Sequence, residues 1–179
     1  MILGVDRLLK LVKEKKLVEN LCERELKNPE GAGFDLRIGE IYEIYGRGFL
    51  GIEERETPKI KLLAKYNPKK KTSFVFRPGK YYLMKTLERV NTPENILILF
   101  RPRGTIFRMG LMIFTANVSP GYKGELVFGI KNLGPCEVKI ELGARVVYAM
   151  FFEVRGKSNL YRGQWQGGRV TTKKKEKQV

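Results

Sequence analysis

The chain has 179 residues, room for one ordinary domain with a real core, and its 35 Lys and Arg against 19 Asp and Glu give a formal charge of +16. It contains no histidine, which excludes His-dependent nucleophile systems, His-ligated zinc and a His general base. Any chemistry must therefore use carboxylates, Lys, Tyr, backbone groups or a metal that the ligand carries. The charge indicates a polyanionic partner.

The first residues lack the basic start and sustained apolar stretch of a signal peptide, and no apolar run approaches the ~18 residues that cross a bilayer. Cys22 and Cys136 form one distant pair, which builds neither a disulfide framework nor a zinc motif. We therefore expect a cytoplasmic protein with reduced cysteines and no membrane contact.

The spacing of apolar residues predicts a helix at the start and strands afterwards. Val5, Leu8, Leu9 and Val12 recur at helical intervals, so a helix is predicted over 5–16 with Asp6 as its cap. Short runs rich in Ile, Val, Tyr and Phe follow at 40–45, 59–63, 73–76, 80–84, 95–100, 112–114, 125–130, 136–140 and 145–154. This texture predicts an all-β sandwich, jelly roll or barrel with a short N-terminal helix.

Two basic runs interrupt the pattern. Residues 69–71 are three lysines after an Asn-Pro turn signal, which predicts a hairpin tip. Residues 169–179 hold five basic residues, one acid and no core-forming pattern, which predicts a mobile tail. Both runs are either solvated surface or sites of non-specific nucleic-acid attraction.

Three segments contain residue types suited to binding. Residues 100–110 hold three arginines and Thr105 directly after a strand, which is either a polyphosphate cradle or a strand-to-helix corner whose arginines pair with acids. Residues 115–126 form a Pro-Gly hairpin in which Tyr122 either packs on a sugar or base or anchors the hairpin. Residues 159–169 surround Trp165 with glycines and glutamines, as in a flap that closes on a ligand or in a flexible linker.

In this order the segments resemble the dCTP deaminase branch of the trimeric dUTPase superfamily, over nearly the whole chain. Asp-Leu-Arg-Ile-Gly at 35–39 is similar to the first family motif, and Arg-Pro-Gly at 77–79 precedes a strand as it does there. Residues 103–108 resemble the phosphate motif. Thr-Ala at 115–116 with Pro-Gly-Tyr-Lys-Gly at 120–124 resembles the hairpin motif, and 161–167 resembles the terminal flap.

The resemblance implies one dUTPase-like domain over 1–168, a distorted β-barrel or jelly roll with a flap at 159–168. It also implies a homotrimer with active sites between subunits, and Mg²⁺ brought in on a deoxypyrimidine triphosphate. Asp35 would orient water around that magnesium ion or brace its motif. The resemblance implies these substrate-binding residues: Arg103, Gly104, Thr105, Arg108, Thr115, Ala116, Tyr122, Tyr161, Gln164, Trp165 and Gln166.

The positions that carry the family's chemistry differ in this chain. Family deaminases use a strand glutamate rather than zinc, and that position is Gly129. Family dUTPases use an acid before Pro-Gly, and that position is Ser119, while a serine of the phosphate motif is Gly104. Glu125 lies four strand residues from Gly129, roughly 13 Å away, which is beyond reach of the same water. Glu137 and Glu141 on the following strand are the other candidate acids.

Three interpretations of function follow. The first is a hydrolase in the pathway from dCTP to dUTP to dUMP, with dCTP deamination the favoured reaction if the chain is active. The second is a nucleotide-binding or regulatory relative without catalysis, because the family acids are missing. The third is a nucleic-acid-binding protein driven by the positive charge, which predicts a steep salt dependence.

Overall fold

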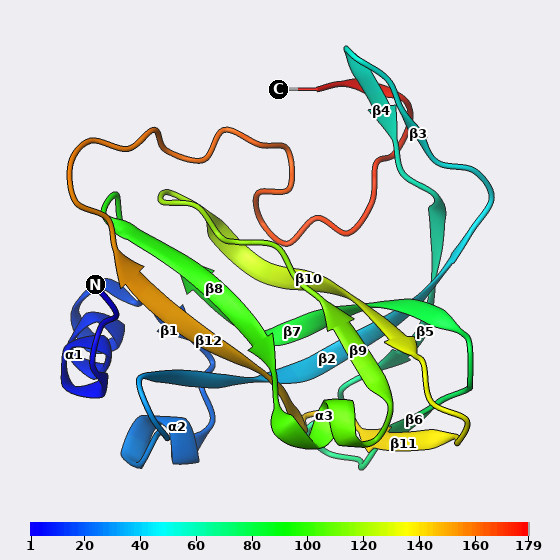
Figure 1. Cartoon of the computed structure of the whole chain (residues 1–179), viewed down its shortest axis with the longest axis horizontal. Coiled ribbons are helices and arrows are strands. Elements are labelled where there is room, and N and C mark those ends of the chain that lie inside the picture. The colour runs from blue at the N-terminus through cyan, green and yellow to red at the C-terminus, as the bar shows by residue number, and fades with distance from the viewer. Residues whose placement is uncertain (179) are drawn as a thin grey trace.

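The structure is a computed structural model that describes residues 1–178. Its main element is an eight-stranded antiparallel sheet, in which six strands follow the order β8-β12-β2-β7-β10-β9, β5 pairs with β2, and β1 pairs with β7. Backbone hydrogen bonds between Ile98 and Val118 join the segment after β9 to β8, so the sheet curls into a nearly closed barrel (Figure 1). The bounds of these strands are β1 Val18–Glu19, β2 Gly33–Tyr45, β5 Lys59–Lys65, β7 Tyr81–Asn91, β8 Ile96–Pro102, β9 Leu111–Phe114, β10 Lys123–Asn132 and β12 Arg145–Glu153.

Alternation of side chains explains why these segments form strands around one core. Along β7 every second residue from Tyr82 to Val90 is buried, and the residues between them face outward. The mainly β prediction is therefore confirmed, and each run predicted as a strand overlaps one. Two smaller sheets add β6 (Ser73–Phe76) with β11 (Val138–Glu141), and β3 (Phe49–Leu50), β4 (Glu54–Glu56) and β13 (Glu176–Lys177). The sequence pattern predicts none of β1, β3, β4 and β13, because strands of two or three residues carry no readable alternation.

The helices are short. α1 spans Val5–Lys15, one residue shorter than predicted, because Lys16 adopts the left-handed conformation with φ 52° that ends it. Its N-cap is Gly4 rather than Asp6, which lies in the first turn. α2 (Glu23–Lys27) was not predicted, and α3 (Gly104–Arg108) lies between β8 and β9. Within residues 1–178 no helix is both long enough and apolar enough to cross a membrane.

The C-terminal segment differs from the expected mobile tail in that several of residues 169–178 have defined partners. β13 pairs with β4, Thr172 is buried, and both Thr171 and Thr172 exchange hydrogen bonds with Thr57. Glu176 compensates the local positive charge because Arg55 and Arg169 both bind it. Val179 lies outside the described residues.

Candidate functional site

A cavity of about 560 Å³ lies between the sheet and the C-terminal segment. This volume is within the range of small-molecule sites. The hairpin between β9 and β10, strands β7 and β10, the segment before β5, the flap and the tail all contribute walls. The lining residues are Ile44, Thr57, Pro58, Tyr81, Leu83, Ala116, Asn117, Val118, Ser119, Tyr122, Leu126, Val127, Phe128, Tyr161, Trp165, Arg169, Val170 and Thr171.

Tyr122 is fixed at the hairpin end of the cavity. Its side chain is 8% exposed, its hydroxyl donates to the Glu125 carbonyl at 2.7 Å, and it accepts from the Gly168 amide at 3.2 Å. Burial raises the pKa of Tyr122 to about 12, so the hydroxyl is neutral at physiological pH. These bonds support the anchoring interpretation of Tyr122, whose side chain also lines the cavity, while its contact with a sugar or base stays a prediction.

The flap folds onto this hairpin through backbone and amide hydrogen bonds. The Tyr161 amide donates to the Pro120 carbonyl at 2.7 Å, and the Tyr161 ring packs edge-on against Tyr122 with centroids 5.3 Å apart. Gln166 accepts from the Lys123 amide and donates to the Gly121 carbonyl. Gln166 therefore holds the flap in place rather than lining the cavity.

A cluster of four side chains joins the flap to the tail, and we call it the latch: Arg55, Trp165, Arg169 and Glu176. The Arg55 and Arg169 guanidinium groups lie 4.6 and 5.6 Å from the centroid of the Trp165 ring. Both arginines bind Glu176, and Arg55 also donates to the side chain of Gln164. Cation–π contacts and shared charge pairing thus fix Trp165 as a cavity wall.

The position of the missing strand carboxylate is occupied by another residue. Gly129 lies on β10, and the ring of Tyr81 on β7 covers it so closely that a Cβ at 129 would collide with the Tyr81 hydroxyl and lie 2.9 Å from Cζ. No Asp or Glu of residues 1–178 lines the cavity. Glu125 instead lies against Gly168 of the flap, and Glu137 approaches Arg77. Among the described residues, the cavity of a single chain therefore offers no carboxylate in place of the acids that the resemblance implies at 119 and 129.

The phosphate motif lies apart from this cavity in the same chain. Figure 1 shows α3 at the opposite side of the molecule from the orange flap. Thr105 and Arg108 are exposed there, and Arg108 donates to the Gly104 carbonyl at 3.0 Å. Arg103 and Gly104 line a separate hollow together with Asp35. The structure therefore brings together Ala116, Tyr122, Tyr161 and Trp165, but not the arginines predicted to bind phosphate.

Asp35 is engaged by arginines rather than being free to bind a solvated ion. Its Oδ2 accepts from Arg103 Nε at 2.9 Å and from Arg145 at 3.0 Å, and Arg145 also binds the buried Glu25 at 3.1 Å. Burial raises the pKa of Asp35, and the nearby Glu25 charge adds to this, while Arg103 and Arg145 oppose it. This geometry favours the bracing role, in which Asp35 orients Arg103.

The remaining predicted residues lie outside the cavity walls. Thr115 is exposed, and Gln164 faces Arg55. Sequence reasoning missed Tyr81, Arg55 and Arg169 as parts of the site. The sequence places Tyr81 at the start of a predicted strand and Gly129 within another. It does not show that these strands pair, or in which register, so the contact between the two residues could not be predicted.

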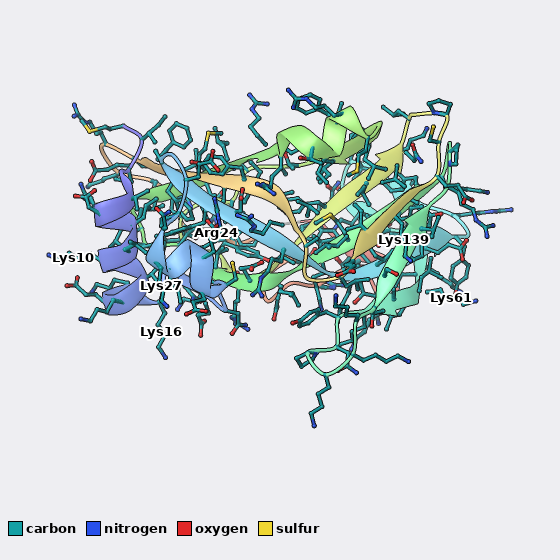
Figure 2. All side chains as sticks on the ribbon, turned by 90° about the horizontal axis from the view of Figure 1, so that it is seen from below. Lys10, Lys16, Arg24, Lys27, Lys61 and Lys139 are labelled. Carbon is teal, nitrogen blue, oxygen red and sulfur yellow. The ribbon has the colours of Figure 1, made fainter. Side chains whose placement is uncertain are left out.

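The positive charge is distributed over the surface. Figure 2 shows Lys10, Lys16 and Lys27 at the end formed by the first two helices, and Lys61 and Lys139 at the other end. Lys61 belongs to β5 and Lys139 to β11. The labelled cations thus do not gather at the cavity.

Comparison of the sequence with known proteins places the chain in a family. The model of the dCTP deaminase-like family matches residues 2–154. A probable deoxyuridine 5'-triphosphate nucleotidohydrolase of Methanothermobacter thermautotrophicus is 34% identical over 142 residues, covering 79% of this chain and 89% of that protein. A dCTP deaminase of Pyrobaculum calidifontis is 31% identical over 173 residues, covering 96% and 95%.

The fold has a solved counterpart. The crystal structure of the 2'-deoxycytidine 5'-triphosphate deaminase from Agrobacterium tumefaciens superposes with a TM-score of 0.64 at 16% identity. The match covers 84% of this chain and 46% of that one, so the chain spans about half the length of that protein. The curled sheet, the hairpin and the matching family model lead to one conclusion: the chain belongs to the dCTP deaminase-like family.

Proposed function

We propose that the chain binds deoxypyrimidine nucleoside triphosphates in the cavity beneath the flap and does not deaminate cytosine. Relatives named dCTP deaminase and dUTP nucleotidohydrolase support the ligand class. The absence of deamination is inferred from one observation: Tyr81 occupies the space beside Gly129 where the family carboxylate would stand. Activating a water for attack on C4 needs a base within hydrogen-bond reach, and the cavity walls offer none among the described residues.

The proposal includes a homotrimer, because the cavity and the phosphate motif lie apart in one chain. A neighbouring copy would present Arg103, Thr105 and Arg108 to the triphosphate, with Mg²⁺ arriving on that triphosphate as part of the substrate. Arginine side chains are suited to bidentate binding of phosphate oxygens. In the proposed trimer, each of the two hollows of one chain would contribute half of a different binding site.

Purified protein with magnesium and either dCTP or dUTP tests this function. Calorimetry should show saturable binding of both nucleotides, and chromatography should show no dUTP formed from dCTP at micromolar protein. Arg108→Ala should weaken binding by about tenfold or more, since charge-assisted hydrogen bonds contribute roughly 1.5–3 kcal/mol. Arg47→Ala is the matched control, because Arg47 is an exposed arginine outside both hollows. Formation of dUTP, or absence of nucleotide binding, would overturn the proposal.

Hydrolysis of dUTP to dUMP and pyrophosphate is the second candidate. The 34% identical relative and a 26% identical protein of Methanocaldococcus jannaschii both carry dUTP nucleotidohydrolase names, which favours it. It requires a carboxylate that a neighbouring copy would contribute, since Ser119 stands at the hairpin position. Release of pyrophosphate from dUTP, measured in the same incubation, supports this candidate, and its absence rejects it.

A further inference from the structure

Tyr81 occupies the space that every side chain other than glycine would need at position 129. It begins β7, pairs with Lys131 and leans over Gly129, which pairs with Leu83 two residues further along. Because a Cβ on Gly129 would collide with the phenol, tyrosine at 81 and glycine at 129 depend on each other. The ring is 37% exposed and packs against Phe114, with centroids 5.9 Å apart.

Tyr81 forms part of the cavity wall, and its hydroxyl lies over Gly129 of β10. Its neighbours on this wall, Leu83 and Val127, are apolar. Burial raises the pKa of Tyr81. The group is therefore a neutral hydroxyl with one donor and two acceptor positions. A polar group beside apolar wall residues is suited to orienting a ligand.

We propose that Tyr81 determines base recognition in this chain, with its hydroxyl hydrogen-bonded to the polar edge of the pyrimidine. This inference rests on the proposed function. The hydroxyl donates to the carbonyl oxygen of a uracil or accepts from the amino group of a cytosine, because its proton rotates to suit either. A carboxylate at position 129 would only accept. With the Tyr81 phenol in place of a carboxylate at 129, this part of the cavity would bind both bases without activating a water for attack on C4.

Tyr81→Phe tests the inference because it keeps the ring over Gly129 and removes only the hydroxyl. The dissociation constants of dUTP and dCTP should both rise about 3- to 10-fold, the size expected for one neutral hydrogen bond. Tyr82→Phe is the matched control, since Tyr82 is the next residue on β7 and packs in the core against Phe74 and Phe76. That variant should bind both nucleotides as the unchanged protein does.

Gly129→Ala tests the same Tyr81 hydroxyl by displacing the phenol instead of removing its oxygen. A single methyl at 129 pushes the phenol off the strand, so binding of both nucleotides should again weaken while the thermal midpoint confirms a folded chain. Inorganic tripolyphosphate, which lacks a base, separates base contact from phosphate contact. Its affinity should be the same for the unchanged protein and for Tyr81→Phe.

The outcomes separate the two proposals. If the unchanged protein binds neither dUTP nor dCTP, the proposed function fails. If it binds both and Tyr81→Phe binds them equally well, the role of Tyr81 is overturned while the function stands. A Tyr81→Phe variant that loses affinity for tripolyphosphate by the same factor also overturns the inference, because the tyrosine then acts through the fold or the phosphate site.

Discussion

Arg145 shows how a single residue supports the candidate phosphate motif. The side chains of Glu25 and Asp35 are 1% and 6% exposed, and Arg145 bridges them with bonds of 3.1 and 3.0 Å. Arg103 shares Asp35 with it. Two buried carboxylates this close are tolerated only while guanidinium groups compensate them. The orientation of Arg103 therefore depends on a residue 42 positions away in the sequence.

Arg145→Met should lower the free energy of unfolding by about 3–5 kcal/mol, because it leaves buried carboxylates with one cation fewer. Urea denaturation measures this loss. The control is Arg77→Met. The Arg77 side chain is 73% exposed and its Nε lies 3.9 Å from Glu137, so this change should cost less than about 0.5 kcal/mol. Equal losses in the two variants would contradict the account.

Glu40 makes the stability of the folded chain depend on pH. Burial raises the pKa of Glu40, but hydrogen bonds from Lys85, Tyr42 and Lys65 outweigh it and lower the pKa to about 2. The folded pKa lies below the ordinary value of 4.5, so the stabilisation is present above that value and is lost as pH falls toward 2.

Glu40→Gln should remove this dependence. Between about pH 5 and pH 2.5, the unchanged protein should lose on the order of 1–2 kcal/mol more stability than the variant. Urea unfolding at both pH values gives the difference. Glu43→Gln on the same strand is the control, since Glu43 is exposed and should follow the unchanged protein. If Glu40→Gln loses more stability on acidification than the unchanged protein does, the role of Glu40 is contradicted.

At the scale of elements, the tail and the flap behave as one unit. β13 pairs with β4, and within the latch Arg55 and Arg169 each contact both Trp165 and Glu176. Arg55 and Glu176 are 121 positions apart, so the latch joins the β3–β4 hairpin to the end of the chain. Two of the cavity walls, Trp165 and Arg169, are held by these contacts.

Glu176→Gln should loosen the flap without unfolding the sheet, because it leaves two arginines side by side without their shared carboxylate. Hydrogen exchange at the Gly167 and Gly168 amides, which bond the hairpin, should accelerate by about tenfold or more. The amides of β7 should keep their protection. Lys174→Gln, an exposed change in the same tail, should have no effect. Unchanged exchange at both glycines would show that the latch does not hold the flap.

At the scale of the whole molecule, the candidate site is divided between two faces of one chain. The hairpin and flap enclose the cavity, whereas Arg103 and Gly104 border another hollow. The proposed homotrimer would join these two faces of neighbouring copies into one complete site.

Mixing two defective variants tests this arrangement. Arg108→Ala damages the phosphate half and Trp165→Ala damages the cavity half, so each protein alone should bind dUTP weakly. Refolded together in equal amounts, they should recover tight binding in about a quarter of the sites, the fraction in which random assembly pairs two intact halves. Sedimentation should show the trimer in every sample. Recovery of no tight sites would mean that each chain builds its own site.

Much of the fold and part of the site are predictable from local patterns. The all-β class follows from short alternating runs, and the hairpin and flap follow from Pro-Gly-Tyr and from glycines around Trp165. Such signals sit within a few residues of one another, so no knowledge of packing is needed to read them. The order of the motifs also identifies the family to which the chain belongs.

The sequence by itself shows that histidine is absent and that Ser119 and Gly129 stand where the family resemblance implies carboxylates. Only the tertiary structure decides what replaces them. Tyr81 reaches Gly129 through the register of β7 with β10, and Glu176 reaches Arg55 through the pairing of β13 with β4. Register and long-range packing depend on the free energy of the whole sheet and not on the residues of one segment. For that reason the sequence shows only that residue 129 has no side chain, whereas the fold shows that the Tyr81 ring occupies the space beside it.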